Sequence, residues 1–233
     1  MVASVTPVRS VGVVEGLVPG GVLVVQFTVA AGCGLRQDEV FGLAVGDVDF
    51  LRGVVHVRRQ GKGLGGRQVY APPKGRKMRD VPLPESVALD LAAHLQAWPA
   101  VPVELPGEDV TGSPRSADLL LSTRERTALQ RNYINPKVWK PALILAGVDP
   151  TRENGMQTLR HFYASVLLDA GESVRALAEY LGHADPGFTL RVYTHLMPAS
   201  EERTKQAVDY VFGGGVPTQL LTACAPNVHQ SGP

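Results

Sequence analysis

The sequence contains few cysteines and no hydrophobic run long enough to span a membrane. Two cysteines in 233 residues, Cys33 and Cys224, are too few for a disulfide framework, which favours a reducing compartment and a cytoplasmic protein. Residues 1–7 lack the basic segment and the following apolar stretch of a secretory signal. The apolar run at residues 22–33 falls short of the ~20 residues that a membrane span needs. We therefore expect this run to form a buried helix.

An excess of charge of one sign is also absent, since 23 Lys and Arg face 22 Asp and Glu. A net charge of +1 is weak evidence for nucleic-acid binding. The positive charge is unevenly distributed, however, because residues 52–79 contain nine Lys or Arg and no Asp or Glu. Such a segment is typical of a phosphate-facing surface, although a solvated hairpin has the same composition. The residues predicted to contact phosphate are Arg58, Arg59, Lys62, Arg67, Arg76, Lys77 and Arg79.

The pattern of apolar residues predicts an α+β domain, mainly α-helical, with a small antiparallel three-stranded sheet. Strands are expected within residues 48–57 and 68–83, which a glycine-rich turn separates. Residues 98–118 are rich in Pro and Gly and are expected to form a loop. Asn135 and Pro136 are expected to cap and to begin a helix. Helices are expected over residues 22–31, 36–45, 84–97, 135–146, 157–170, 173–181, 188–196 and 200–212.

These elements indicate one domain over residues 21–212. Residues 1–20 show weak periodicity, so their structure stays uncertain. Residues 213–233 consist of Gly, Pro and polar residues, and we expect them to be disordered.

The chemistry-bearing residues gather in residues 158–196, where Arg160 precedes His183 and Tyr193. A tyrosine can attack a phosphodiester and form a covalent phosphotyrosine, which splits one difficult step into two. Arginine suits the surrounding clamp because its planar fork donates two hydrogen bonds to phosphate oxygens and stays charged. The six histidines show no metal-ligand spacing with Cys, Asp or Glu, so we expect no metal and no cofactor.

In these residues and their spacing the chain resembles the tyrosine recombinase (phage integrase) family, in particular integrases of actinobacterial type. The resemblance extends from about residue 6 to residue 212 and matches the family's catalytic domain. It implies integration or excision of double-stranded DNA through a 3′-phosphotyrosine, by four protomers assembled on two DNA sites. The family's DNA-clamping domain, which precedes the catalytic one, has no room in this sequence and is expected to be absent.

The resemblance also assigns the remaining site residues. Arg36, in Gly-Leu-Arg-Gln-Asp-Glu-Val, matches the first Arg box, and Glu39 lies on the same helical face, where it can hold that Arg. Lys74, in Lys-Gly-Arg-Lys-Met-Arg-Asp-Val-Pro-Leu, matches the lysine that protonates the leaving oxygen. Lys62 and Lys77 are competitors for this role. His183, in Leu-Gly-His, matches a His or Trp that contacts the phosphate.

One position departs from the family pattern. Gln157 stands where the family has a His three residues before the second Arg, and an amide cannot transfer protons as an imidazole does. His161 follows Arg160 directly and is expected to point elsewhere on the helix. The departure leaves open a catalytically weakened remnant that still binds DNA.

Two further alternatives remain open. Tyr163 and Tyr180 are rival nucleophiles by residue type, but their helical spacing with leucines favours packing. The helices expected at residues 157–170 and 173–181 also fit a non-enzymatic helix-turn-helix DNA-binding regulator.

Overall fold

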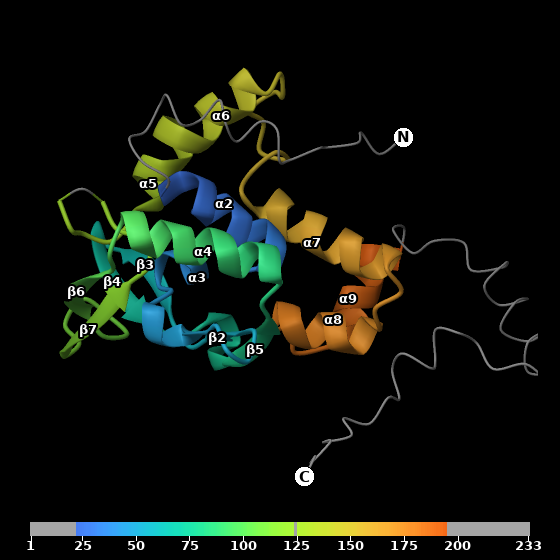
Figure 1. The fold of residues 1–233 in the computed structure, drawn as a ribbon, viewed down its shortest axis with the longest axis horizontal. Coiled ribbons are helices and arrows are strands. Elements are labelled where there is room, and N and C mark those ends of the chain that lie inside the picture. The colour runs from blue at the N-terminus through green and yellow to red at the C-terminus, as the bar shows by residue number, and fades with distance from the viewer. Residues whose placement is uncertain (1–21, 124, 195–233) are drawn as a thin grey trace, which may run out of the picture. The chain divides into compact units, whose positions relative to one another are not determined.

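The computed structural model describes residues 22–123 and 125–194 as a helical domain with three small antiparallel sheets (Figure 1). No helix in this part of the chain is long and apolar enough to cross a membrane. The helices are α2 (Val22–Cys33), α3 (Gln37–Phe41), α4 (Glu85–Ala97), α5 (Arg131–Ile134), α6 (Lys140–Leu145), α7 (Gln157–Asp169), α8 (Val174–Leu181) and α9 (Pro186–Tyr193). Shorter turns are η1 (Val45–Asp47), η2 (Lys74–Arg76) and the π-helical η3 (Asn135–Trp139). The expected helix at residues 200–212 and the two tails lie outside the described residues.

The predicted three-stranded antiparallel sheet is confirmed. Its strands β1 (Val48–Asp49), β2 (Val54–Val57) and β5 (Arg79–Pro82) are ordered β1-β2-β5, and Val55 faces Val48 on one side and Val81 on the other. Between β2 and β5 in sequence, β3 (Gln60–Leu64) and β4 (Arg67–Ala71) pair with each other as a separate hairpin.

The prediction of a loop at residues 98–118 is wrong, because β6 (Val101–Pro106) and β7 (Pro114–Leu119) form an antiparallel hairpin there. Val101 and Val103 alternate with exposed residues, so the strand has one buried face. The prolines suggested a loop because they cannot donate to a ladder. In a two-stranded ribbon each strand has an unpaired edge, which a proline nitrogen can face without loss.

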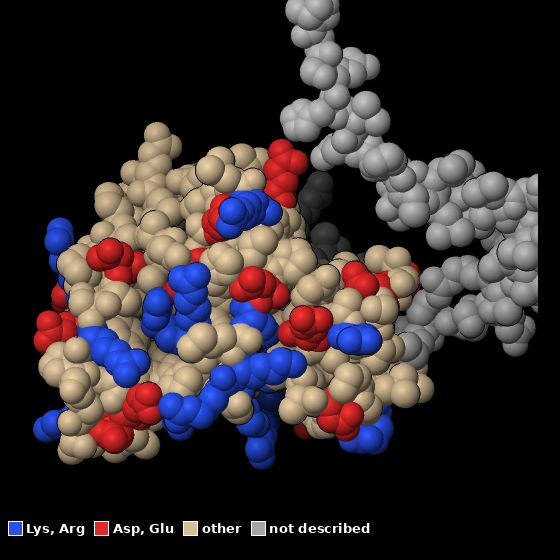
Figure 2. Space-filling view, turned by 90° about the horizontal axis from the view of Figure 1, so that it is seen from below, with Lys and Arg blue, Asp and Glu red and all other residues tan. Residues whose placement is uncertain are grey.

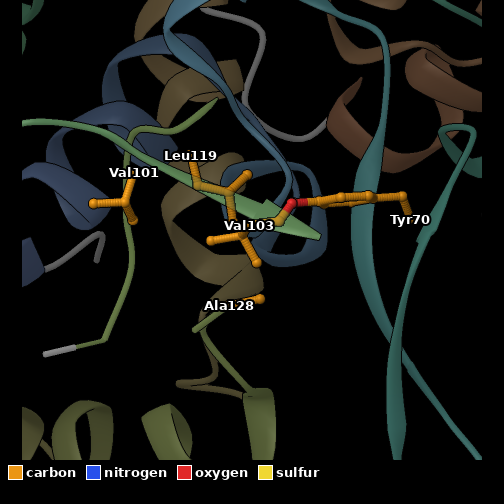
Figure 3. Close-up of a cluster of buried hydrophobic side chains, with 5 residues drawn as sticks. All are labelled: Tyr70, Val101, Val103, Leu119 and Ala128. Atoms are coloured by element: carbon orange, nitrogen blue, oxygen red, sulfur yellow. The ribbon is translucent and has the colours of Figure 1, made fainter. Parts of the chain in front are cut away.

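The β6–β7 hairpin joins the domain through a buried apolar cluster (Figure 3). The cluster consists of Tyr70 of β4 together with Val101, Val103, Leu119 and Ala128. The Tyr70 hydroxyl donates to the Val103 carbonyl at 2.9 Å, so its polar end is satisfied inside the cluster. This contact fixes the hairpin β3–β4 relative to β6–β7.

The expected start of the helix at Asn135 is also wrong. The helix begins at Arg131 with Gln130 at its N-cap, and Pro136 lies inside a continuous helical run. Pro136 has no N–H to donate and its ring crowds the preceding turn, and the helix widens there into the π segment η3. The sequence correctly predicted a helix around Pro136, but the helix starts at Arg131 and not at this proline.

Local capping signals set the C-terminal helices. The Ser173 hydroxyl accepts from the Ala176 N–H at 3.1 Å and starts α8 as expected, and Gly182 ends it at φ 64°. Asp185 accepts from the Gly187 N–H at 2.8 Å, so α9 begins at Pro186, two residues earlier than expected. Asp185, Pro186 and Gly187 thus form the N-cap and the start of the helix.

The Tyr70 contact predicts a measurable loss of stability. Tyr70→Phe removes the buried hydroxyl and leaves the Val103 carbonyl without its donor, so the free energy of unfolding should fall by about 1 kcal/mol. Urea denaturation measures the change, with Tyr133→Phe as the control because Tyr133 is exposed. Equal losses in the two variants would show that the Tyr70 hydroxyl contributes nothing specific.

Candidate active site

Arg160 is the buried centre of the candidate site. It projects inward from α7 with 1% of its surface exposed. Its Nη1 donates to the Gly34 carbonyl at 2.7 Å, and its Nη2 donates to the Leu181 carbonyl. Burial and the nearby Arg36 lower the pKa of Arg160 to about 9, which still leaves the guanidinium charged at neutral pH. Two backbone carbonyls therefore hold a full positive charge inside the domain.

Gly34 is required at its position for two reasons. Its φ of +62° lies in the left-handed region, and a Cβ there would lie 2.4 Å from Tyr163 Cδ1. The Tyr163 ring is 7% exposed and fills the space beneath the loop. Tyr163 thus packs in the core, as expected for the rival tyrosine.

Arg36 caps α3, and the structure has the contact with Glu39 that the sequence predicted. The Glu39 carboxylate accepts from the Arg36 N–H at 2.8 Å and from its Nη1 at 3.0 Å. The Arg36 side chain keeps 20% of its surface exposed, while that of Glu39 has none. The carboxylate thus holds Arg36 at the surface of the site.

Arg79 is a correction to the predicted phosphate-facing segment. Its side chain is 2% exposed and binds the same Glu39 carboxylate through two bonds of 3.0 and 2.7 Å. Its Nε donates to the Tyr180 carbonyl at 2.6 Å. Burial raises the pKa of Glu39, but the guanidiniums of Arg79 and Arg36 outweigh it and lower the pKa to about 2. Arg79 therefore supports the site from within and cannot lie on an exposed phosphate-binding surface.

His183 follows the C-terminal glycine of α8 and contacts Arg160. The Arg160 Nη2 lies 3.2 Å from His183 Nε2, and the Thr189 hydroxyl lies 2.6 Å from His183 Nδ1. Because an arginine only donates, Nε2 is the acceptor and Nδ1 carries the proton toward Thr189. Burial and the charge of Arg160 lower the pKa of His183 to about 4, so the imidazole is neutral.

Tyr193 ends α9 with its ring buried at 3% exposure, and its hydroxyl oxygen lies 3.0 Å from His161 Nδ1. Burial raises the pKa of Tyr193, and the charges of Arg160 and Arg36 act against this rise. His161 points elsewhere on α7 than the buried Arg160, as expected, but it still belongs to the site through its contact with Tyr193. His161 lies one helical turn beyond Gln157, on the same face of α7, and α9 brings Tyr193 to that face.

The remaining predicted residues lie around this cluster. Gln157 is the first residue of α7 and is exposed, and its side chain makes no hydrogen bond within the described residues. Lys77 Nζ donates to the His183 carbonyl at 3.2 Å. Lys74 is exposed in η2 and Lys62 is exposed in β3, and neither makes a hydrogen bond to another described residue. The structure thus brings Lys77 against the site and leaves Lys74 extended in solvent.

The basic segment, residues 52–79, has a smaller excess of positive charge in the folded structure than its sequence suggests. Arg58 and Arg59 pair with Asp47 at 3.7 and 2.5 Å, and Arg76 lies 3.3 Å from Glu108. Figure 2 shows acidic side chains among the cationic ones on the face at the bottom of Figure 1, where β2 and β5 lie. Acids from other segments therefore fold onto residues 52–79 and neutralise part of their charge.

The cluster as a whole keeps a positive excess. One carboxylate, Glu39, stands among the guanidiniums of Arg36, Arg79 and Arg160. The arrangement suits an anion that approaches the exposed edge of Arg36. Within residues 22–123 and 125–194, no three His, Cys, Asp or Glu side chains are grouped as metal ligands.

The structure thus brings Arg36, Arg160, His183 and Tyr193, on which the predicted family resemblance rests, into one region of the domain. The model described as the phage integrase family matches residues 23–200, which is well over half of the chain. The chain belongs to the phage integrase family. The predicted family resemblance is thereby confirmed.

The alignments with individual relatives cover most of this integrase-family chain but only about half of each relative. The tyrosine recombinase XerA of Thermococcus kodakarensis is 34% identical over 176 residues, which cover 73% of this chain and 51% of XerA. XerC of Pseudomonas putida is 33% identical over 167 residues, covering 70% of this chain and 44% of XerC. The chain therefore spans about half the length of the curated relatives it matches.

Solved structures confirm the predicted fold class, that of a tyrosine recombinase catalytic domain. The Tn1549 transposon integrase, solved with circular intermediate DNA, matches with a TM-score of 0.67 at 18% identity, over 86% of this chain and 64% of that one. The catalytic domain of bacteriophage HP1 integrase matches with a TM-score of 0.54 at 16% identity, over 89% of this chain and 96% of that one. At these identities the likeness establishes the fold alone.

Three residues of the cluster were not found from the sequence. Arg79 was assigned to the surface, and Thr189 and His161 were given no role. The helical spacing of four residues between Gln157 and His161 was a usable signal, because such residues share one face. Thr189 and Arg79 depend on contacts across the fold, which no local spacing reveals.

The buried Glu39 carboxylate predicts a loss of stability and a change in its pH dependence. Glu39→Gln removes the charge between two arginines, so the free energy of unfolding should fall by about 3–5 kcal/mol at neutral pH. Because the folded pKa of Glu39 is lowered to about 2 from 4.5, its contribution exists above about pH 4.5 and disappears as the pH falls toward 2. The difference between wild type and variant should therefore shrink across this range.

Denaturation at several pH values measures this difference. Asp38→Asn is the matched control, since Asp38 forms a more exposed pair with Arg131 at 2.9 Å and should change stability by less than about 1 kcal/mol. A difference between wild type and Glu39→Gln that stays constant from pH 7 to pH 2 would contradict the assignment.

Proposed function

We propose that this chain is the catalytic domain of a site-specific recombinase that cleaves and rejoins double-stranded DNA through a 3′-phosphotyrosine on Tyr193. The observation that carries the proposal is that α9 brings the buried Tyr193 onto α7, where its hydroxyl oxygen lies 3.0 Å from the ring of His161, the residue after Arg160. A nucleophilic oxygen held at the helix that carries a buried guanidinium suits phosphoryl transfer to a tyrosine.

The arginines would bind the scissile phosphate. Arg36 keeps an exposed edge and would donate to the phosphate directly, while the buried charge of Arg160 would attract the phosphate from beneath the surface. Their carbonyl and carboxylate partners hold both guanidiniums before DNA arrives, so they need not reorganise as charge develops in the transition state. His183 would orient Arg160 on this side of the phosphate, since its Nε2 accepts from the Arg160 guanidinium.

Lys74 would protonate the leaving 5′ oxygen. Its ammonium group is exposed and free to reach a bound strand, whereas the ammonium group of Lys77 already donates to the His183 carbonyl. Gly75 and Arg76 follow Lys74 at φ values of 75° and 56°, which turn the chain sharply after it. We assign Lys77 the separate role of holding η2 against the site.

Partners and assembly follow from the family. The Tn1549 integrase was solved with circular intermediate DNA, which supports double-stranded DNA as the partner of this chain. Assembly of four protomers on two DNA sites, in the cytoplasm, is part of the proposal. On the exposed surface, Lys62 and Arg67 of the β3–β4 hairpin are the candidates for backbone contacts.

The helix-turn-helix regulator is not favoured. The helix α8, which would be the second helix of such a motif, packs here against β5 and α9, and the family match extends over residues 23–200. No observation of the site favours a remnant that only binds DNA.

The nucleophile is tested by trapping covalent complexes. The chain is incubated with a pool of nicked duplexes with randomised arms, in which a short 5′-hydroxyl strand diffuses away after cleavage and traps the adduct. Wild type should give adducts on a denaturing gel, and Tyr193→Phe should give none, because only the hydroxyl is lost. Tyr163→Phe is the control and should retain adduct formation. Adducts in Tyr193→Phe would contradict the proposal.

The acid is tested with a substrate that carries sulfur at the bridging 5′ position. A thiolate leaves without protonation, since thiols have a pKa of about 8.5. With ordinary DNA, Lys74→Ala should slow adduct formation by about 10²–10⁴-fold, and the sulfur substrate should restore the rate. Any loss in Lys77→Ala should persist with the sulfur substrate. The reverse pattern would identify Lys77 as the acid.

A further inference from the structure

The face of α7 that meets α9 carries two side chains one helical turn apart, Gln157 and His161. A spacing of four residues places them one above the other, about 6 Å apart along the helix axis. Arg160, between them in sequence, points inward instead. The amide of Gln157 and the imidazole of His161 therefore lie on the same exposed face of α7.

The imidazole is the group in contact with the nucleophile. His161 Nδ1 lies 3.0 Å from the Tyr193 hydroxyl oxygen, with the two rings 5.5 Å apart and inclined at 57°. This distance is that of a direct hydrogen bond. Among the described residues, His161 is the side chain within hydrogen-bond distance of the Tyr193 oxygen.

The other side chains of the site are unsuited to accept the phenolic proton. Arg160 is a cation that only donates. Both nitrogens of His183 are engaged, by Arg160 and Thr189, and burial together with the surrounding charges lowers the pKa of its ring and so opposes protonation. Gln157 has an amide, which is not basic at neutral pH. An imidazole, in contrast, can accept a proton on the ring nitrogen that carries none.

We propose that His161 is the general base that takes the proton of Tyr193 in DNA cleavage, an inference that rests on the recombinase function proposed above. As the phenolic oxygen bonds to phosphorus, its O–H bond breaks and the proton passes to His161 Nδ1. The P–O5′ bond breaks in the same step, and the 5′ oxygen takes a proton from the lysine acid. In rejoining, the oxygen of the 5′-hydroxyl bonds to phosphorus and its proton returns to the lysine amine. The bond between phosphorus and the Tyr193 oxygen breaks, and the imidazolium returns its proton to the departing phenolate.

This role accounts for the departure at position 157. The imidazole that the family pattern has at that position is replaced by one a turn further along α7, at the nucleophile. Gln157 remains able to donate to a phosphate oxygen, so proton transfer and phosphate contact fall to different residues. The departure from the pattern then need not weaken cleavage.

The kinetic test replaces the base while keeping a hydrogen bond. His161→Asn places amide atoms near the position of Nδ1 without a basic nitrogen, and should slow single-turnover adduct formation by about 10²–10⁴-fold. His56→Asn is the matched control, because the Nδ1 of His56 contacts Asp80 on the sheet, and it should leave the rate unchanged. Equal rates for wild type and His161→Asn would overturn the inference.

A more acidic phenol separates a base from a structural support. With a fluorinated tyrosine at position 193 that is ionised at the assay pH, no base is needed. The penalty of His161→Asn should then largely disappear. A penalty of the same size with both tyrosines would mean that His161 only supports the fold, which overturns the inference.

A second measurement does not depend on cleavage. Nitrogen-15 NMR of the DNA-free chain at neutral pH should show His161 Nδ1 without a proton, and its signal should shift in Tyr193→Phe. A protonated Nδ1 in neutral His161 would overturn the inference, whatever the activity. Failure of wild type to form any adduct would instead contradict the recombinase function, and the NMR result would still decide what His161 does.

Gln157→His compares the two imidazole positions directly. With His161 intact this change should alter the rate little, because the proton already has an acceptor. A large gain in Gln157→His combined with no loss in His161→Asn would overturn the inference and support the weakened remnant.

Discussion

The buried carboxylate of Glu39 is the interaction on which the rest of the site depends. Its two oxygens accept from the backbone and side chain of Arg36 and from both terminal nitrogens of Arg79. Through these bonds it joins the start of α3 to β5, and Arg79 extends the connection to α8 through the Tyr180 carbonyl. The single negative charge of Glu39 therefore holds together α3, β5 and α8, which are distant in sequence. Without it, the arginines would repel one another in a poorly solvated space.

The positive charge that Glu39 leaves unpaired, that of Arg160, is available to attract an anionic substrate. Arg160 has no carboxylate in direct contact, and the carbonyls of Gly34 and Leu181 hold it instead. Carbonyl dipoles orient a guanidinium without neutralising it, so its charge stays available to an anion. A domain that buries charge in this way loses stability relative to an apolar core, and gains a site that need not reorganise during reaction. A left-handed glycine beside a packed tyrosine shows how closely the backbone must approach to do this.

Features of the fold and the site that depend on residues close in sequence could be predicted from the sequence. Ser173 and Gly182 mark the ends of α8, and the Arg36–Glu39 contact follows from helical spacing. Features that depend on distant partners were not predictable. The β6–β7 hairpin was obscured by prolines whose cost depends on whether a neighbouring strand needs their N–H. The basic segment contains no acid of its own, yet Asp47 and Glu108 fold onto it from outside.

The two histidines of the site show why residue type alone does not give a role. His183 lies among cations with both nitrogens engaged, so its ring stays neutral with the proton on Nδ1. His161 stands on the more exposed face of α7 and presents Nδ1 to a phenol. If Tyr193 donates, the proton of His161 is on Nε2, the opposite tautomer. His183 then contacts the arginine whose charge attracts the phosphate, and His161 contacts the nucleophile. Their difference arises from the neighbours that the fold gives each ring, because the two side chains are chemically identical.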